Sequence, residues 1–127
     1  MELRTVLSNV SIVIDYSLDT NQFFDTPLKK SVMQAAADAF SSRLTDQLLA
    51  IAPSGANRWS AGVNHPGTGA GINIDNLVVP ENTIIVYAGA REFQGGIAAI
   101  GGPGGFSPSD NHGSPAFLNA VTTGGRA

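Results

Sequence analysis

The uneven distribution of glycine most limits the fold that this 127-residue chain can adopt. Ten of its 15 glycines lie between Gly89 and Gly125. The run Gly101-Gly102-Pro103-Gly104-Gly105 is unsuited to the interior of a helix or strand, because glycine loses much entropy on ordering and proline lacks an amide hydrogen. We therefore expect one domain with a strand–helix–strand core in residues 1–93. Residues 94–127 form its glycine-rich loop region, with one short element at Phe117 to Val121.

Two elements are expected before residue 50. Residues 10–18 alternate apolar and polar side chains, which predicts a β-strand. Thr26-Pro27 then favours a helix start, since threonine caps free amides and proline suits the first helical position. A repeat of four predicts an amphipathic helix from Pro27 to about Asp46, which buries the stripe Val32, Ala36, Phe40, Leu44 and Leu48, with Met33 and Ala37 beside it.

The sequence predicts mainly strands in the rest of the core, from residue 48 to residue 88. Leu48 to Ile51 either ends the helix or begins a strand, and Trp59 to Val63 alternates as a strand before the turn His65-Pro66-Gly67. Leu77 to Val79 is an apolar run stopped by Pro80. Thr83 to Ala88 is the strongest strand and apolar on both faces, which is typical of the middle of a covered sheet. We expect an α/β fold of the α+β kind, with a small mixed twisted sheet backed by one long helix.

Composition excludes several classes of function. The net charge is −3, and only Lys29 and Lys30 are adjacent cations, which argues against nucleic-acid binding. The chain has no cysteine, so disulfides, thiolate metal sites and cysteine nucleophiles are excluded. No apolar run is long enough to span a membrane, and residues 1–5 do not begin a signal peptide. The low share of charged residues favours an extracellular location.

The histidines do not form a zinc motif. Zinc proteases of the H-E-x-x-H kind carry two histidines on successive turns of one helix. His65 lies in an expected turn and His112 in an expected loop, so we interpret both as exposed loop residues and predict no metal ligand.

Oxygen ligands for calcium cluster in the first turn, but their spacing does not match an EF-hand loop. Asp110-Asn111 is a second such pair. We interpret both groups as turn formers, because Asp and Asn favour turns. The first group consists of Asp15, Asp19, Asn21 and Asp25.

Motifs for other chemistry are weak. The glycines at 101–105 lack the context of a phosphate loop. Three serines near His112 and Asp110 lack a nucleophile elbow and an oxyanion site, so they predict no triad. These serines are Ser107, Ser109 and Ser114.

Carbohydrate chemistry is equally weakly supported. Glu81 and Glu92 show no pairing that would indicate a glycosidase. Trp59 either stacks on a sugar or belongs to the core, and the core is favoured. Asn9-Val10-Ser11 matches a glycosylation sequon.

Several stretches nevertheless resemble the N-terminal region of a family of secreted, metzincin-like bacterial zinc metalloproteases. These are Asp15–Phe24, Ala35–Asp46, Val79–Arg91 and Gly101–Gly105, and the resemblance extends from about Val10 to Ala127. It implies a metzincin-like subdomain in which the zinc-binding helix comes later and a peptide substrate adds to a sheet edge. The zinc-binding histidines and the catalytic glutamate of the family have no matching positions here, so no catalytic, cofactor-binding or metal residue is predicted.

We hypothesise that the chain is the non-catalytic N-terminal part of a secreted metalloprotease-like protein. Its parent would hydrolyse peptide bonds with zinc, its partner would be the downstream catalytic portion of the same protein, and this part alone would be inactive. The alternative is a stand-alone extracellular binding or structural module with no enzymatic activity. The third hypothesis is a free-standing hydrolase that uses the serines near His112.

Overall fold

The computed structural model describes residues 10–106 and 111–123. Within these residues the chain is a small mixed α/β protein with two helices and two sheets, consistent with an α+β fold. The elements in chain order are β1 (Ser11–Asp15), α1 (Pro27–Ser41), β2 (Ser60–Asn64), β3 (Gly71–Asp75), β4 (Thr83–Tyr87), β5 (Gly105–Phe106) and α2 (Pro115–Thr123).

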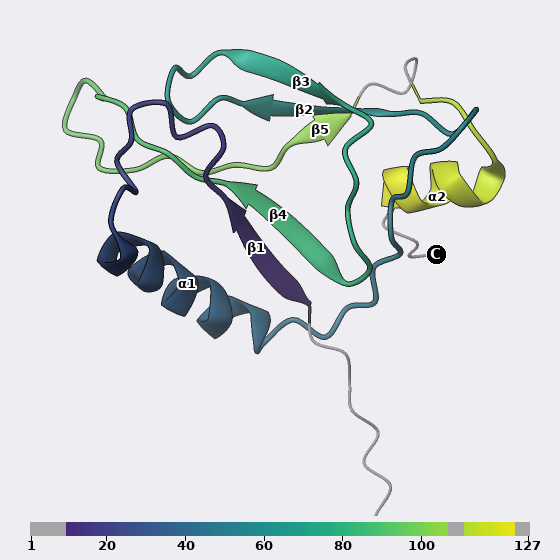
Figure 1. Ribbon diagram of the computed structural model, residues 1–127, viewed down its shortest axis with the longest axis horizontal. Helices are drawn as coiled ribbons and strands as arrows, with labels where there is room; N and C mark the ends of the chain where they lie inside the picture. The colour runs from purple at the N-terminus through teal and green to yellow at the C-terminus, as the bar shows by residue number, and fades with distance from the viewer. Residues whose placement is uncertain (1–9, 107–110, 124–127) are drawn as a thin grey trace, which may run out of the picture.

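The first sheet is the parallel pair β1–β4, with Ile12 opposite Ile84 and Ile14 opposite Val86. Figure 1 shows α1 running alongside β1, with the second sheet beyond β4. Val10, just before β1, is 1% exposed. Ile12 and Ile14 are half-buried on the same strand face as Val10, since alternate residues share a face. The β1 half of this face is therefore the part that α1 covers.

The start of α1 follows the sequence prediction. The Thr26 hydroxyl accepts a hydrogen bond from the Lys29 amide at 3.4 Å, and Pro27 occupies the first turn. Lys29, although close to the positive end of the helix dipole, has its own partners. Its ammonium donates to Asp25 Oδ1 at 3.1 Å and to the Phe23 carbonyl at 2.8 Å.

The end of α1 and its buried stripe were predicted wrongly. The helix ends at Ser41 rather than near Asp46, because the Leu44 carbonyl accepts a hydrogen bond from the Val10 amide and the chain must leave the helix to reach it. Ala37 is the buried residue, whereas Val32 and Phe40 are 63% and 67% exposed. The buried face of the helix is therefore displaced from the predicted apolar stripe by about one residue position.

The place of β4 in its sheet was also predicted wrongly. Within the described part of the chain, β4 pairs with β1 alone and is not a central strand. Ile84 and Val86 are 38% and 39% exposed, although they share a sheet face with Ile12 and Ile14. The described residues therefore cover the apolar side chains of β4 only in part.

The second sheet is antiparallel, in the order β3-β2-β5. The strand at Trp59 to Val63 is confirmed as β2, while β3 was missed because Gly71 resembles a loop residue. The predicted short element near the end is α2, which lies within the glycine-rich region. Leu77–Val79 and Leu48–Ile51 form no strand, and a single bridge joins Ile51 to Val79.

The main core lies between the second sheet and α2. Its buried members are Trp59, Ala61, Phe117 and Val121. The Trp59 indole N–H donates to the Leu77 carbonyl at 2.8 Å, so the one polar atom of the ring has a partner inside this core. Trp59 is thereby confirmed as a core residue rather than a surface for sugars.

Removing the α2 anchor tests this core. We expect Phe117→Ala to lower the free energy of unfolding by about 3–5 kcal/mol, because it leaves a cavity beside Trp59. Phe106→Ala, at a half-open site on β5, is the control and should cost much less. Urea denaturation followed by tryptophan fluorescence measures both, and equal losses would contradict the placement of α2.

Candidate functional site

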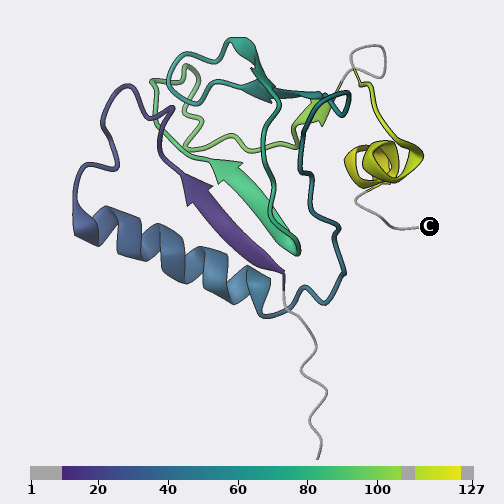
Figure 2. The same cartoon turned by 45° about the vertical axis from the view of Figure 1, so that its right-hand side comes forward.

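Three segments far apart in the sequence meet at the carboxyl ends of β1 and β4. They are the loop after β1 (residues 16–26), the β2–β3 turn (65–70) and the segment after β4 (88–91), which we call the loop junction (Figure 2). The Asn21 side-chain amide donates to the Gly67 carbonyl at 3.1 Å and to the Ala90 carbonyl at 2.7 Å. One side chain therefore joins all three segments.

Close packing at the junction requires glycine at two positions. A Cβ on Gly89 would lie 3.1 Å from the Pro66 ring and 3.3 Å from the Asp19 Cα atom. Gly69 has a φ of +79° and lies against the Arg91 guanidinium, which donates to the Thr68 carbonyl at 3.4 Å. The junction is thus a set of interlocking main-chain turns with little room for a ligand between them.

The four candidate oxygen ligands, interpreted from the sequence as turn formers, mostly make local contacts at the junction. Asp15 Oδ1 accepts from the Ser17 amide, and the two Asp19 carboxylate oxygens accept from the amides of Phe23 and Phe24. Asp25 forms an exposed ion pair with Lys29, whose hydrogen bond and charge lower the pKa of the Asp25 carboxyl. These contacts favour the turn-forming interpretation of the cluster.

The two histidines have different environments. The half-buried His65 accepts hydrogen bonds at Nδ1 from the amides of Gly67 and Thr68, at 3.0 and 3.2 Å, so its interpretation as an exposed residue was wrong. His112 is exposed and exchanges backbone hydrogen bonds with Arg58. Over residues 10–106 and 111–123, no three His, Cys, Asp or Glu side chains lie close enough to hold a metal ion.

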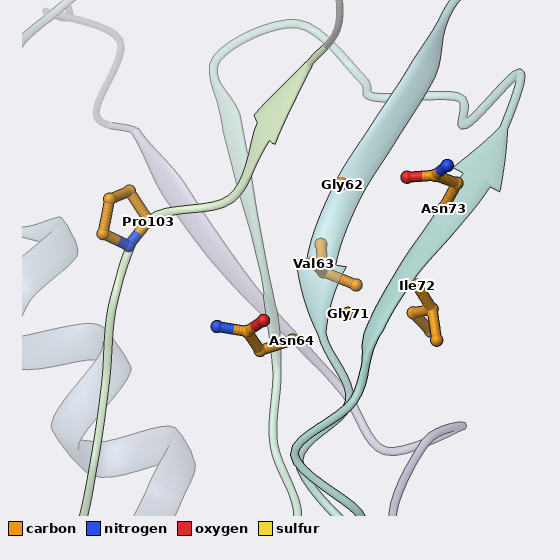
Figure 3. A pocket seen from close by; sticks show the side chains of 7 residues that line it. All are labelled: Gly62, Val63, Asn64, Gly71, Ile72, Asn73 and Pro103. Atoms are coloured by element: carbon orange, nitrogen blue, oxygen red, sulfur yellow. The ribbon is translucent and has the colours of Figure 1, made fainter.

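Two open hollows lie along the β2–β3 hairpin. The first, of about 230 Å³, is lined by residues of both strands and by Pro103, with the amides of Asn64 and Asn73 at its sides (Figure 3). The second, of about 380 Å³, includes Asn73 as well as Ser60, Asp75 and His112.

The second hollow gathers residue types that also occur in hydrolytic triads. The Ser60 hydroxyl donates directly to Asp75 Oδ1 at 2.8 Å, whereas in a triad the imidazole lies between the serine and the acid. The arrangement therefore does not activate Ser60. Sequence reasoning missed this cluster because its members come from separate segments whose contact depends on strand pairing.

Of the three serines that were considered for a triad, only Ser114 lies within the described residues. Ser107, Ser109 and Asp110 lie outside the described residues. The Ser114 hydroxyl accepts from the Phe117 amide at 3.2 Å and the Ser114 amide donates to Asn57 Oδ1 at 2.9 Å, so Ser114 serves as the N-cap of α2.

The remaining sequence candidates are dispersed. Glu81 precedes β4 and Glu92 follows it, so the two carboxylates lie toward opposite ends of one strand. The glycine-rich run at 101–104 leads into β5, which begins at Gly105, rather than into a helix, unlike a phosphate loop. Asn9 of the sequon and Asp110 of the second oxygen pair lie outside the described residues. Asn111 is half-buried, and both polar atoms of its side chain are shielded from solvent.

Comparison with known proteins finds no matching family model, no matching curated protein and no matching solved structure. Within the described residues, no helix has the length and apolar character needed to cross a membrane.

The parallel pair gives a pH-dependent prediction. Burial raises the pKa of Tyr87, and the charge of Asp15 raises it further. A raised pKa means that the folded state holds the phenol proton more tightly than the unfolded state, so stability falls as pH rises above the ordinary tyrosine value of about 10. We expect Tyr87→Phe to reduce this alkaline loss in thermal melts recorded from about pH 8 to pH 11. Tyr16→Phe is the control, and an equal reduction in both variants would argue against burial as the cause.

The junction predicts an effect of Asn21. Asn21→Ala removes two hydrogen bonds to carbonyls and should lower the free energy of unfolding by about 1–3 kcal/mol. Asn21→Asp should destabilise as well, because a carboxylate would face the same two carbonyl oxygens. Chemical denaturation measures both, with the exposed Gln94→Ala as control. Full stability of Asn21→Asp would show that the amide does not donate to these carbonyls.

Proposed function

We propose that this chain is a non-catalytic scaffold, the N-terminal part of a secreted bacterial metalloprotease-like protein. Its partner would be the downstream catalytic portion of the same protein, which would hydrolyse peptide bonds with zinc. The proposal combines the resemblance of four sequence stretches to that family with one structural observation, the uncovered apolar surface beside α1.

The main structural support for the proposal is the half-covered face of the β1–β4 sheet. Parallel sheets are normally covered on both faces, and their strands are then apolar throughout. Here α1 covers the β1 half, while Ile84 and Val86 on the β4 half remain more than a third exposed. A second amphipathic helix lying over β4 would bury these side chains, and in the proposed parent that helix is the one that binds zinc.

The outer surface of α1 supports the same proposal. Leu28, Val32 and Phe40 are exposed large apolar side chains on one 15-residue helix. Exposed apolar clusters on a soluble protein commonly mark contact surfaces. A scaffold enclosed by further polypeptide would use such surfaces, whereas a small stand-alone module would gain solubility from polar residues there.

The described residues of this chain do not fit zinc. His65 uses Nδ1 to accept two amide hydrogen bonds, and His112 lies on a different segment, beside Arg58. The metal and the catalytic glutamate would therefore come from the downstream portion, and this chain would contribute the sheet. An outer strand such as β3 or β5 would offer main-chain groups to a peptide substrate.

The proposal is tested with the coding sequence that follows Ala127. We expect an H-E-x-x-H helix within the next ~100–200 residues, the scale of one domain. The polypeptide containing it, co-expressed as a separate chain, should bind this scaffold. The double variant Ile84→Thr/Val86→Thr should weaken that binding at least tenfold in a titration, because it removes the apolar surface of β4.

The matched control is Val78→Thr, at an exposed valine outside both sheets. It should leave binding unchanged. Absence of the motif would contradict the proposal and favour the stand-alone module, as would zinc-dependent peptide hydrolysis by this chain alone.

A further inference from the structure

His65 is held in an arrangement that requires an uncharged ring. Its Nδ1 atom accepts hydrogen bonds from the amides of Gly67 and Thr68, at 3.0 and 3.2 Å. A neutral imidazole can accept at one nitrogen, whereas a protonated imidazole donates from both. Protonation would therefore turn two hydrogen bonds into two contacts between donors.

The β2–β3 turn (65–70), which contains His65, contacts both other segments of the loop junction. The His65 carbonyl accepts from the amides of Thr68 and Gly69, and the His65 amide donates to the Ala70 carbonyl. The carbonyls that face the other segments belong to the same turn: Gly67 accepts from Asn21, and Thr68 accepts from Arg91. Loss of the turn geometry would displace both contacts.

The charged groups around the turn do not supply a negative charge that would pair with a protonated His65 ring. From the segment after β4, the Arg91 guanidinium lies against Gly69, which places a second cation at the turn. From the loop after β1, the Asp19 carboxylate accepts from the amides of Phe23 and Phe24. Within the described residues, no carboxylate forms an ion pair with His65.

We propose that His65 is an acid-sensitive latch for the loop junction. With a neutral ring, the β2–β3 turn is closed, and the Asn21 and Arg91 contacts hold the loop after β1 and the segment after β4 against it. Histidine is the side chain whose charge ordinarily changes between about pH 5 and 8. Acidification therefore releases the three segments at the carboxyl ends of β1 and β4 while both sheets remain paired. This latch does not depend on the proposed function.

Amide hydrogen exchange, followed by NMR and corrected for the intrinsic effect of pH, tests the latch. Between about pH 7.5 and pH 5, the protection of the Gly67 and Thr68 amides should fall at least about tenfold, the loss expected when two hydrogen bonds break. The side-chain amide of Asn21 should lose protection in the same interval. Amides in the centres of β1 and β4 should keep theirs, which separates release of the latch from global unfolding.

His65→Asn is the matched variant, because an asparagine side-chain oxygen accepts from the amide two residues on and carries no titrating proton. Its turn should remain protected at both pH values, to within about twofold of its value near pH 7.5. His112→Asn changes the other histidine and should show the full wild-type loss.

Two results would overturn the latch. One is constant protection of Gly67 and Thr68 in the wild-type chain across this interval. The other is an equal loss in His65→Asn, which would assign the effect to a different group. Should the turn in the His65→Asn variant be less stable near neutral pH, the change of protection with pH within each protein still decides between these results.

Discussion

The parallel pairing of β1 with β4 is the constraint on which the rest of the structure depends. The two strands are distant in sequence, although Ser11 lies opposite Thr83 in the sheet. The chain forms α1 and the β2–β3 hairpin after β1 and before β4. The segment after α1 contacts the amino ends of both strands. The Leu44 carbonyl accepts from the Val10 amide before β1, and the Leu48 carbonyl accepts from the Asn82 amide before β4. The carboxyl ends open into the loop junction. The pair thus determines where α1 ends and which loops meet.

Apolar surface is distributed unequally around this pair. The second sheet and α2 enclose Trp59 and Phe117 in a core whose indole N–H has a partner. Among the described residues, α1 covers the β1 half of the first sheet, whereas Ile84 and Val86 on β4 are more than a third exposed. A sequence selected to be soluble alone would place polar side chains at such positions. This inequality is why we favour a scaffold that acts together with further polypeptide over a stand-alone module.

Polar side chains that suggest ligands in the sequence serve the backbone in the structure. Asp19 accepts from two amides, Asn21 donates to two carbonyls, and His65 accepts from two more amides. Turns expose main-chain donors and acceptors that no regular ladder satisfies, so nearby short polar side chains are drawn to them. An Asp, Asn and His cluster near glycines therefore indicates turn chemistry as readily as a metal site. Asp19 and His65 find their partners within their own turns, whereas Asn21 donates to carbonyls in two other segments, so the role of Asn21 follows only from the folded chain.

What the sequence alone determined are the features with local causes. Alternation identified β1 and β2, a run of apolar residues identified β4, and Thr26-Pro27 located the start of α1, because strand patterning and helix capping act over a few residues. The tertiary structure decided the features that depend on distant partners. The chain left α1 so that the Leu44 carbonyl could accept from the Val10 amide, and within the described residues β4 became a partner of β1 alone. The fold also brought the carbonyls of Gly67 and Ala90 to the Asn21 side chain. Local patterns carry no record of which distant segment supplies a hydrogen bond or covers a face, so these outcomes followed only from the folded chain.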